Sequence, residues 1–129
     1  MTTKRIINGE LASLLARFRH VNAIAIVDGP FPTYPNVETV DLAVVLGLPS
    51  IPDVLTAILP HVEVTSVTMA AEFEAKAGAK VVSDYRKVIS HLPLNIIAHE
   101  EFKVKVGQTL GIIHTGDNVP YSSVILNCG

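Results

Sequence analysis

The chain has 129 residues, of which 49% are hydrophobic and 17% are charged, and its formal net charge at pH 7 is −2. This length fits one domain, 1–129, and the interspersed acids and bases exclude the basic footprint of a nucleic-acid-binding protein. Mean hydropathy is +0.42. This value is high for a small domain with a limited interior, so we expect apolar surface to be buried between the subunits of a homo-oligomer.

The same composition predicts a cytoplasmic protein that does not enter a membrane. No apolar run reaches the roughly 18 residues that a membrane helix needs. The first residues lack the apolar core of a signal peptide. Cys128 is the only cysteine, so an intramolecular disulfide is impossible and a reducing compartment is expected.

A helix followed by a buried strand is predicted in the first part of the chain. Asn8 suits the N-cap of a helix that begins near Glu10. Four apolar residues at the spacing of one helical face support it: Leu11, Leu14, Leu15 and Phe18. His20 comes at the end of this helix, where the helix dipole favours a protonated imidazole. The apolar run 23–27 predicts a strand ending at Asp28, and α/β sheets bind ligands just beyond the carboxyl ends of such strands.

A proline-rich loop follows Asp28. Pro30, Pro32 and Pro35 exclude regular structure from residues 29–36. They also stiffen the loop, because they reduce the entropy that is lost when it becomes ordered. Two interpretations fit this pattern equally well: the wall of a ligand pocket, and a simple surface connection.

The rest of the chain alternates between predicted strands and helices. Apolar runs predict five further strands: 40–46, 62–69, 94–98, 110–114 and 124–126. Helices are predicted over 53–59, over 83–90 and from His99, whereas residues 70–76 fit a helix or a loop. This order, which closes with two strands joined by a turn, indicates an α/β domain with a mixed β-sheet flanked by helices.

Three polar residues in these segments are assigned structural roles. Ser50 caps the helix 53–59. Asp41 interrupts the strand 40–46, where an acid needs a hydrogen-bonding partner or an outward orientation. Asp117 is interpreted as a turn residue, because its neighbours have turn composition.

Common cofactor and catalytic motifs are absent from the sequence. It contains no GxGxxG or GxxxxGK[ST] phosphate-binding loop, no CxxC or HExxH metal motif and no GxSxG nucleophile elbow. The five histidines are too scattered to specify a metal site. We therefore predict neither a cofactor nor a metal. Asp28 and His99, which each follow a buried strand, point instead to a pocket of polar side chains.

Several segments together resemble one known family. They are His20 with the strand ending at Asp28, Val40-Asp-Leu-Ala43 with Gly47-Leu-Pro-Ser50, His99-Glu-Glu-Phe-Lys103, and Thr115-Gly-Asp with Pro120-Tyr-Ser-Ser-Val-Ile-Leu126. In this order and spacing they resemble the D-ribose pyranase and L-fucose mutarotase family over nearly the whole chain. The ribose branch is the more similar of the two.

The resemblance implies a cytoplasmic, cofactor-independent isomerase that assembles into a ring, typically a decamer of two stacked pentamers. Such an enzyme interconverts the pyranose and furanose forms of a monosaccharide, here D-ribose. By motif position, His20 is the proton donor. The residues implied in sugar binding are Asp28, His99, Tyr121, Ser122 and Ser123. The site of this family lies between neighbouring subunits.

One departure from the family pattern concerns the sugar itself. The ribose branch commonly has Tyr-Ala-Asn where this chain has Tyr121-Ser122-Ser123. Asparagine offers a carbonyl acceptor and an amide donor, whereas serine offers one shorter hydroxyl. Two alternatives therefore stay open: a mutarotase of L-fucose or another sugar, and a non-catalytic sugar-binding accessory of a transport system.

Overall fold

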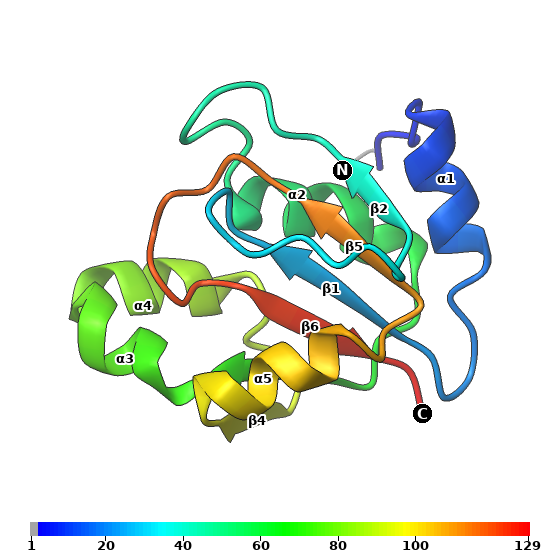
Figure 1. Ribbon diagram of the computed structural model, residues 1–129. Coiled ribbons are helices and arrows are strands. Elements are labelled where there is room, and N and C mark those ends of the chain that lie inside the picture. Colours follow the sequence, from blue (N-terminus) through cyan, green and yellow to red (C-terminus); the bar gives the residue numbers. More distant parts are fainter. Residues whose placement is uncertain (1–2) are drawn as a thin grey trace.

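Six strands form one sheet in the computed structural model, which describes residues 3–129 (Figure 1). The strands are β1 (Ala23–Val27), β2 (Thr39–Asp41), β3 (Ser66–Ala70), β4 (Leu94–Ile97), β5 (Gly111–His114) and β6 (Val124–Asn127). Their order in the sheet is β2-β5-β1-β6-β3-β4. The helices are α1 (Gly9–Ala16), α2 (Ile51–Ile58), the short 3₁₀ helix η1 (Leu59–His61), α3 (Ala71–Ala77), α4 (Ala79–Lys87) and α5 (His99–Val106).

The sheet is mixed, as predicted, because one strand runs against the others. β1 pairs in parallel with β5, β5 with β2, and β3 with β4. β6 lies between β1 and β3 and is antiparallel to both. The start of β6 therefore lies at the same edge of the sheet as the carboxyl ends of the parallel strands. The last two strands are connected by residues 115–123, but they are not neighbours in the sheet, because β1 lies between β5 and β6.

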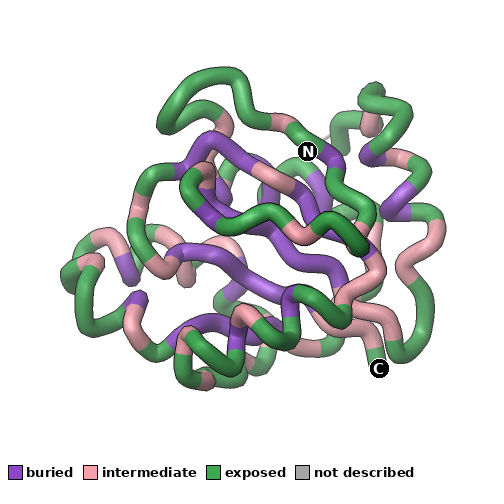
Figure 2. The backbone as a smooth tube through the Cα atoms, in the orientation of Figure 1, coloured by how far each residue is buried: buried purple, intermediate pink, exposed green. Residues whose placement is uncertain are grey.

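Two hydrophobic cores cover the two faces of the sheet. Ile24 and Ile26 of β1 face one core together with apolar residues of α1, α2, α3 and α4. Ala25 and Val27 face the other, which contains residues of α5 and Phe31 of the proline-rich loop. Both faces of β1 are thus buried, which explains its uninterrupted apolar sequence. Figure 2 shows the central strands β5, β1 and β6 mostly in purple.

The N-cap residues predicted for the first two helices, Asn8 and Ser50, are confirmed. The backbone N–H of Leu11 donates to Asn8 Oδ1 over 2.9 Å at the start of α1. Ser50 and Asp53 form a reciprocal capping box at α2. This box starts the helix at Ile51, two residues before the predicted start.

Two predicted strands are shorter in the structure because their partners end. The predicted strand 40–46 becomes β2, which ends at Asp41 opposite His114, the last residue of β5. Residues 43–48 then leave the sheet as an exposed loop, drawn green in Figure 2. The predicted strand 62–69 becomes β3, which begins at Ser66 opposite Asn127 of β6.

The segment 70–76, for which two alternatives were open, forms helix α3. Gly78, with φ +87°, separates it from α4, so the predicted helix 83–90 begins earlier, at Ala79, and ends at Lys87. Among residues 3–129, no helix is both long and apolar enough to cross a membrane.

Candidate functional site

A cavity of about 280 Å³ lies at the carboxyl edge of the sheet. Its lining combines polar and cyclic side chains: Asp28, Pro30, Phe31, Pro32, His99, Asn118, Pro120 and Tyr121. Three of the predicted site residues, Asp28, His99 and Tyr121, are brought together here from segments far apart in sequence. The loop 29–36 contributes three of the lining residues, so it forms a pocket wall and not only a surface connection.

Asp28 is held by Ser123 at the junction of β1 and β6. Ser123 Oγ donates to Asp28 Oδ1 over 2.8 Å, and the backbone N–H of Asp28 donates back to Ser123 Oγ over 3.0 Å. Asp28 is 8% exposed and Ser123 is 2% exposed. Burial raises the pKa of Asp28 above its usual value, and the hydrogen bond from Ser123 opposes part of that rise.

The two predicted serines are turned toward protein groups. The hydroxyl of Ser123 is occupied on both sides by Asp28. Ser122 Oγ donates to the carbonyl of Val119 over 2.7 Å. Neither serine belongs to the cavity lining. Their hydroxyls therefore stabilise the site through hydrogen bonds to Asp28 and to the backbone.

His99 begins helix α5 and packs among aromatic rings. Its ring lies 4.8 Å from that of Tyr121 in an edge-to-face arrangement and 6.3 Å from that of Phe102 in a stacked one. The carboxylate of Glu72, from α3, accepts the His99 backbone N–H at 3.0 and 3.2 Å. His99 Nδ1 is buried without a hydrogen-bond partner among residues 3–129. The imidazole thus has a hydrogen-bonding position that the residues in 3–129 do not fill.

Tyr121 reaches the cavity through an unusual backbone conformation. Its φ is +61°, in the left-handed region that residues other than glycine seldom adopt. Such strain persists only where the surrounding structure imposes it, and it is frequent at ligand sites. Here the turn before β6 places Tyr121 against His99 while Ser122 and Ser123 enter the core.

The assignment of Asp117 as a simple turn residue is wrong. Asp117 is 1% exposed, and its carboxylate accepts three hydrogen bonds: from Ile51 N at 2.8 Å, from Tyr85 Oη at 2.7 Å and from Val119 N at 2.9 Å. Its carbonyl also accepts the N–H of Gly29 over 2.7 Å. Asp117 thus ties the start of α2, the helix α4 and the loop after β1 to the segment that lines the cavity.

Asn118 was not predicted as a site residue. It is exposed and lines the cavity, and its neighbours Asp117 and Val119 are joined by a hydrogen bond. The signal that would have found it is its position: the segment 115–118 follows a buried strand at the same edge of the sheet as Asp28.

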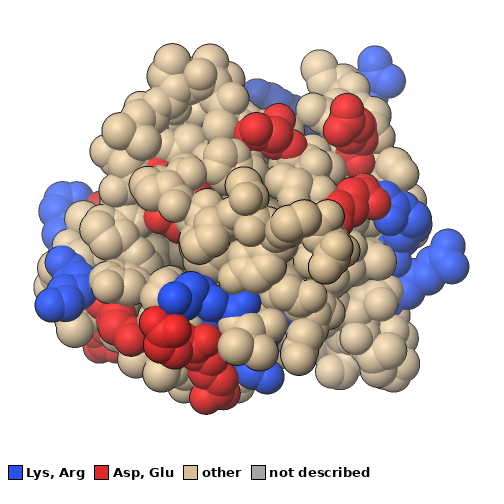
Figure 3. Space-filling view, viewed as in Figure 1, with Lys and Arg blue, Asp and Glu red and all other residues tan. Residues whose placement is uncertain are grey.

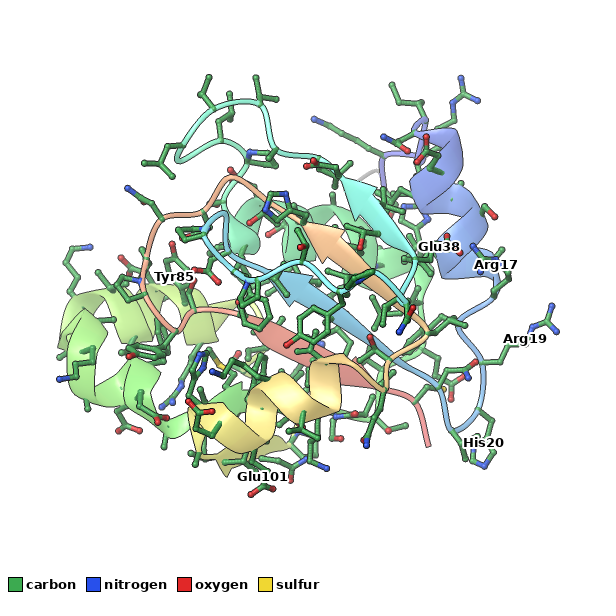
Figure 4. The ribbon with its side chains drawn as sticks, in the orientation of Figure 1. Arg17, Arg19, His20, Glu38, Tyr85 and Glu101 are labelled. Carbon is green, nitrogen blue, oxygen red and sulfur yellow. The ribbon has the colours of Figure 1, made fainter. Side chains whose placement is uncertain are left out.

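His20 lies far from this cavity within one chain. α1 ends at Ala16, and His20 is an exposed residue of the turn before β1, not the end of the helix. The five residues of β1 separate it from Asp28, a length of about 17 Å. Figure 4 shows His20 at one end of the molecule, pointing outward, and Tyr85, the partner of Asp117, near the other end.

The turn that carries His20 is fixed by the last residues of the chain. The N–H of Val21 donates to the Cys128 carbonyl over 2.7 Å, and Gly129 packs against the His20 ring, where a Cβ would lie 2.6 Å from Nδ1. Val21 has φ +64° and is 78% exposed. A β-branched residue in this conformation is a clear outlier, so the turn is held in one specific shape.

Figure 3 shows Lys, Arg, Asp and Glu side chains chiefly toward the rim of the face in view, with mostly uncharged residues at its centre. Within residues 3–129, no group of three or more His, Cys, Asp and Glu is arranged to hold a metal ion. The cavity offers carboxylate, imidazole, amide and phenol groups together with apolar rings, which suits a small neutral polyhydroxylated ligand.

Comparison with known proteins identifies a family. The model of the RbsD / FucU transport protein family matches residues 1–129. The D-ribose pyranase of Bacillus cytotoxicus is 34% identical over 124 residues, which cover 96% of this chain and 94% of that protein. The D-ribose pyranase of Pseudothermotoga lettingae is 35% identical over 132 residues, covering 98% and 90% respectively.

Solved structures agree with this assignment. Bacillus subtilis RbsD, determined in complex with D-ribose, matches with a TM-score of 0.89 and 30% identity, covering 100% of this chain and 98% of that one. The fucose mutarotase of Streptococcus pneumoniae, determined with L-fucose, matches with a TM-score of 0.79 over 95% and 93% of the two chains. Its identity is 20%, so this second match shows a shared fold only.

Proposed function

Because this chain belongs to the RbsD / FucU transport protein family, we propose that it is a D-ribose pyranase, a cofactor-independent isomerase that interconverts the pyranose and furanose forms of ribose. The observation that carries the proposal is the cavity in which Asp28, His99 and Tyr121 meet. Its volume of about 280 Å³ is just below the range of roughly 300–1,000 Å³ that accommodates drug-sized ligands. A monosaccharide fits such a space better than a nucleotide does.

The reaction requires two proton transfers and no redox step. A proton is delivered to the ring oxygen and another is removed from the anomeric hydroxyl, so that the open-chain aldehyde forms and closes again through a different hydroxyl. General acid–base catalysis contributes roughly 10²–10⁴-fold, which is sufficient for a reaction that proceeds slowly unaided. A histidine side chain can perform it near neutral pH.

Three residues of the cavity are assigned roles in sugar binding: Asp28, His99 and Tyr121. Asp28 Oδ1 is engaged by Ser123, so Oδ2 is available to accept a sugar hydroxyl. His99 and Tyr121 donate to or accept from further hydroxyls. Ser122 and Ser123 act indirectly in this arrangement, through the backbone and through Asp28. A site built from such hydrogen bonds rejects a sugar that lacks the matching hydroxyl.

We assign the catalytic proton transfer to His20 of a neighbouring copy of the chain. His20 and Asp28 lie at opposite ends of β1, so one chain does not bring both to the same sugar. Exposed apolar side chains in two separate segments, each suited to subunit contact, support this assignment: Val21, next to His20, is 78% exposed, and in the loop after β2 Val44 is 70%, Val45 62% and Leu46 69% exposed. A pentameric or decameric ring with sites between subunits would bring His20 of one subunit to the cavity of the next. We also propose that the protein is cytoplasmic.

Mixed oligomers test this arrangement. His20→Ala and Asp28→Asn are each expected to abolish ribose exchange, measured by saturation-transfer NMR. When the two variants are co-expressed and assemble at random, about a quarter of the intersubunit sites regain both side chains, so about a quarter of the wild-type rate returns. Recovery of no activity contradicts the intersubunit site. Wild-type rates for the single His20→Ala variant contradict the catalytic assignment, and His91→Ala, at an exposed position, is the control.

The alternatives give different results in the same assay. Faster exchange of L-fucose than of D-ribose assigns the chain to fucose mutarotation. Sugar binding in calorimetry without any accelerated exchange favours a sugar-binding accessory of a transport system.

A further inference from the structure

We propose that His114, at the end of β5, is a positioning residue that holds the sugar-binding loop only while its imidazole is protonated. It does so by linking the carbonyl of Gly29 to the carboxylate of Asp41. The inference deepens the proposed function and rests on it for the identity of the ligand. The state of His114 itself follows from geometry alone.

Both ring nitrogens of His114 face oxygen acceptors. Nδ1 lies 2.9 Å from Asp41 Oδ1, and Nε2 lies 2.9 Å from the carbonyl oxygen of Gly29. A neutral imidazole carries one N–H, and its other nitrogen is an acceptor. Either neutral tautomer would therefore set a nitrogen lone pair against an oxygen lone pair. Only the doubly protonated ring satisfies both contacts.

The contact matters because Gly29 directly follows Asp28. The Gly29 N–H donates to the Asp117 carbonyl over 2.7 Å, and the Gly29 carbonyl accepts from His114. The residue after Asp28 is thus held from both sides. Its space is tight as well, since a Cβ at Gly29 would lie 3.3 Å from the Asp117 carbonyl oxygen.

The two hydrogen bonds by which His114 links Gly29 to Asp41, here called the clamp, also support the wall of the sugar cavity. A second cavity of about 100 Å³ is lined by Asp41 and His114 together with Phe31 and Pro32. Phe31 and Pro32 also line the larger cavity that contains Asp28. This part of the loop therefore borders both the cavity of His114 and the cavity that is proposed to hold the sugar.

His114 is placed so that it can titrate. Its side chain is 25% exposed, so protons exchange with solvent. The charged groups facing it are Asp41 from β2 and Asp28 at the end of β1, and the loop 29–36 contains no charged residue. Burial lowers the pKa of His114, but its hydrogen bonds to Asp41 and Gly29 and the two carboxylate charges outweigh burial, so the pKa lies above its usual value.

The two hydrogen bonds of His114 are both made at pH values below its raised pKa, and one of them is lost as the pH rises through that pKa. Sugar affinity is therefore expected to fall on the alkaline side, through KM more than through kcat, because the clamp orients the binding loop and does not transfer the proton.

The first test observes the ring directly and needs no sugar. The full-length protein, uniformly labelled with ¹⁵N, is titrated by NMR. We expect both His114 nitrogens to be protonated near neutrality, with a midpoint above the usual histidine value near ~6.5, and the Gly29 amide resonance to follow the His114 titration. A neutral His114 with a single tautomer near pH 7 overturns the proposal whatever the chain catalyses.

The second test measures ribose exchange from about pH 6 to about pH 9 in wild type, His114→Arg, His114→Gln and the control His91→Gln. Arginine retains a charge and donors for both acceptors across this range. We expect the ratio of wild-type KM to His114→Arg KM to rise roughly tenfold across this range, because only the wild type loses its charge. His114→Gln is expected to have a raised KM at every pH, and His91→Gln to match wild type.

The possible results separate the two proposals. Parallel pH profiles for wild type and His114→Arg, with both variants folded by circular dichroism, overturn the role of His114. An absence of exchange in wild type with every sugar contradicts the proposed function, while the NMR titration still decides the protonation state of His114.

Discussion

Replacement of Ser123 by alanine tests how the candidate site holds its carboxylate. The substitution removes the donor to Asp28 Oδ1 and the acceptor of the Asp28 N–H, both in a region that is almost completely buried. A hydrogen bond to a charged group contributes about 1.5–3 kcal/mol, and an orphaned buried donor costs about 1–3 kcal/mol. We expect Ser123→Ala to reduce the free energy of unfolding by about 3 kcal/mol at neutral pH.

The pH dependence of this loss is the more specific result. The hydrogen bond from Ser123 lowers the pKa of Asp28 against the larger effect of burial, so its removal raises that pKa further. The charge-assisted bond is fully present above the pKa of Asp28 in the folded chain. It is lost as the pH falls through that pKa toward the unfolded value near ~3.9. The destabilisation should therefore be larger at neutral pH than in acid.

Ser122→Ala provides the matched control. Ser122 is equally buried and also donates one hydrogen bond, but to the neutral carbonyl of Val119. Its loss should cost about 1 kcal/mol with no dependence on pH in the same range. Urea unfolding across this pH range, together with ribose KM, measures both variants. Identical pH profiles for Ser123→Ala and Ser122→Ala would refute the reasoning, as would an unchanged KM in Ser123→Ala, for which we expect about a tenfold rise.

Two further predictions concern the segment that follows β5. Asp117→Ala leaves three donors without their acceptor and should destabilise the fold by about 3 kcal/mol or more, whereas Tyr85→Phe should destabilise it by about 1 kcal/mol. Urea unfolding measures the free energy of unfolding of both variants. The control is the exposed Asp84→Ala, whose stability is expected to lie within ~0.5 kcal/mol of wild type. Equal effects of Asp117→Ala and Asp84→Ala would contradict the buried role. Asn118→Ala removes an amide from the cavity wall and should raise ribose KM by about three- to tenfold at constant kcat, while Asn95→Ala, an exposed residue of β4, should not; an unchanged KM would exclude Asn118 from sugar binding.

The predictions that the structure confirms depend on residues close together in sequence. The apolar run 23–27 is β1 with the predicted bounds, and the helix caps at Asn8 and Ser50 form as expected. In each case the decisive interactions lie within a few residues, so the sequence contains them. The positions of Asp28 and His99 just beyond strands also follow from local pattern, since chain direction alone places such residues at an edge of the sheet.

The wrong predictions concern segments whose structure depends on partners distant in sequence. β2 ends at Asp41 although the sequence stays apolar through Leu46, because β5 offers no residue beyond His114 to pair with. Asp117 lies in a segment of turn composition, yet its carboxylate is buried, because two of its three donors come from α2 and α4. Neither partner is visible from neighbouring residues.

By itself, the sequence determined the α/β class, most elements and the residue types available for acid–base chemistry with a sugar. Only the tertiary structure decided which of these residues meet. β6 inserts between β1 and β3 in the opposite direction, so Tyr121 and Ser123, at its start, join Asp28, at the end of β1. The extended β1 separates His20 from the same cavity. Strand order and direction are set by long-range packing of two cores, which no local periodicity encodes.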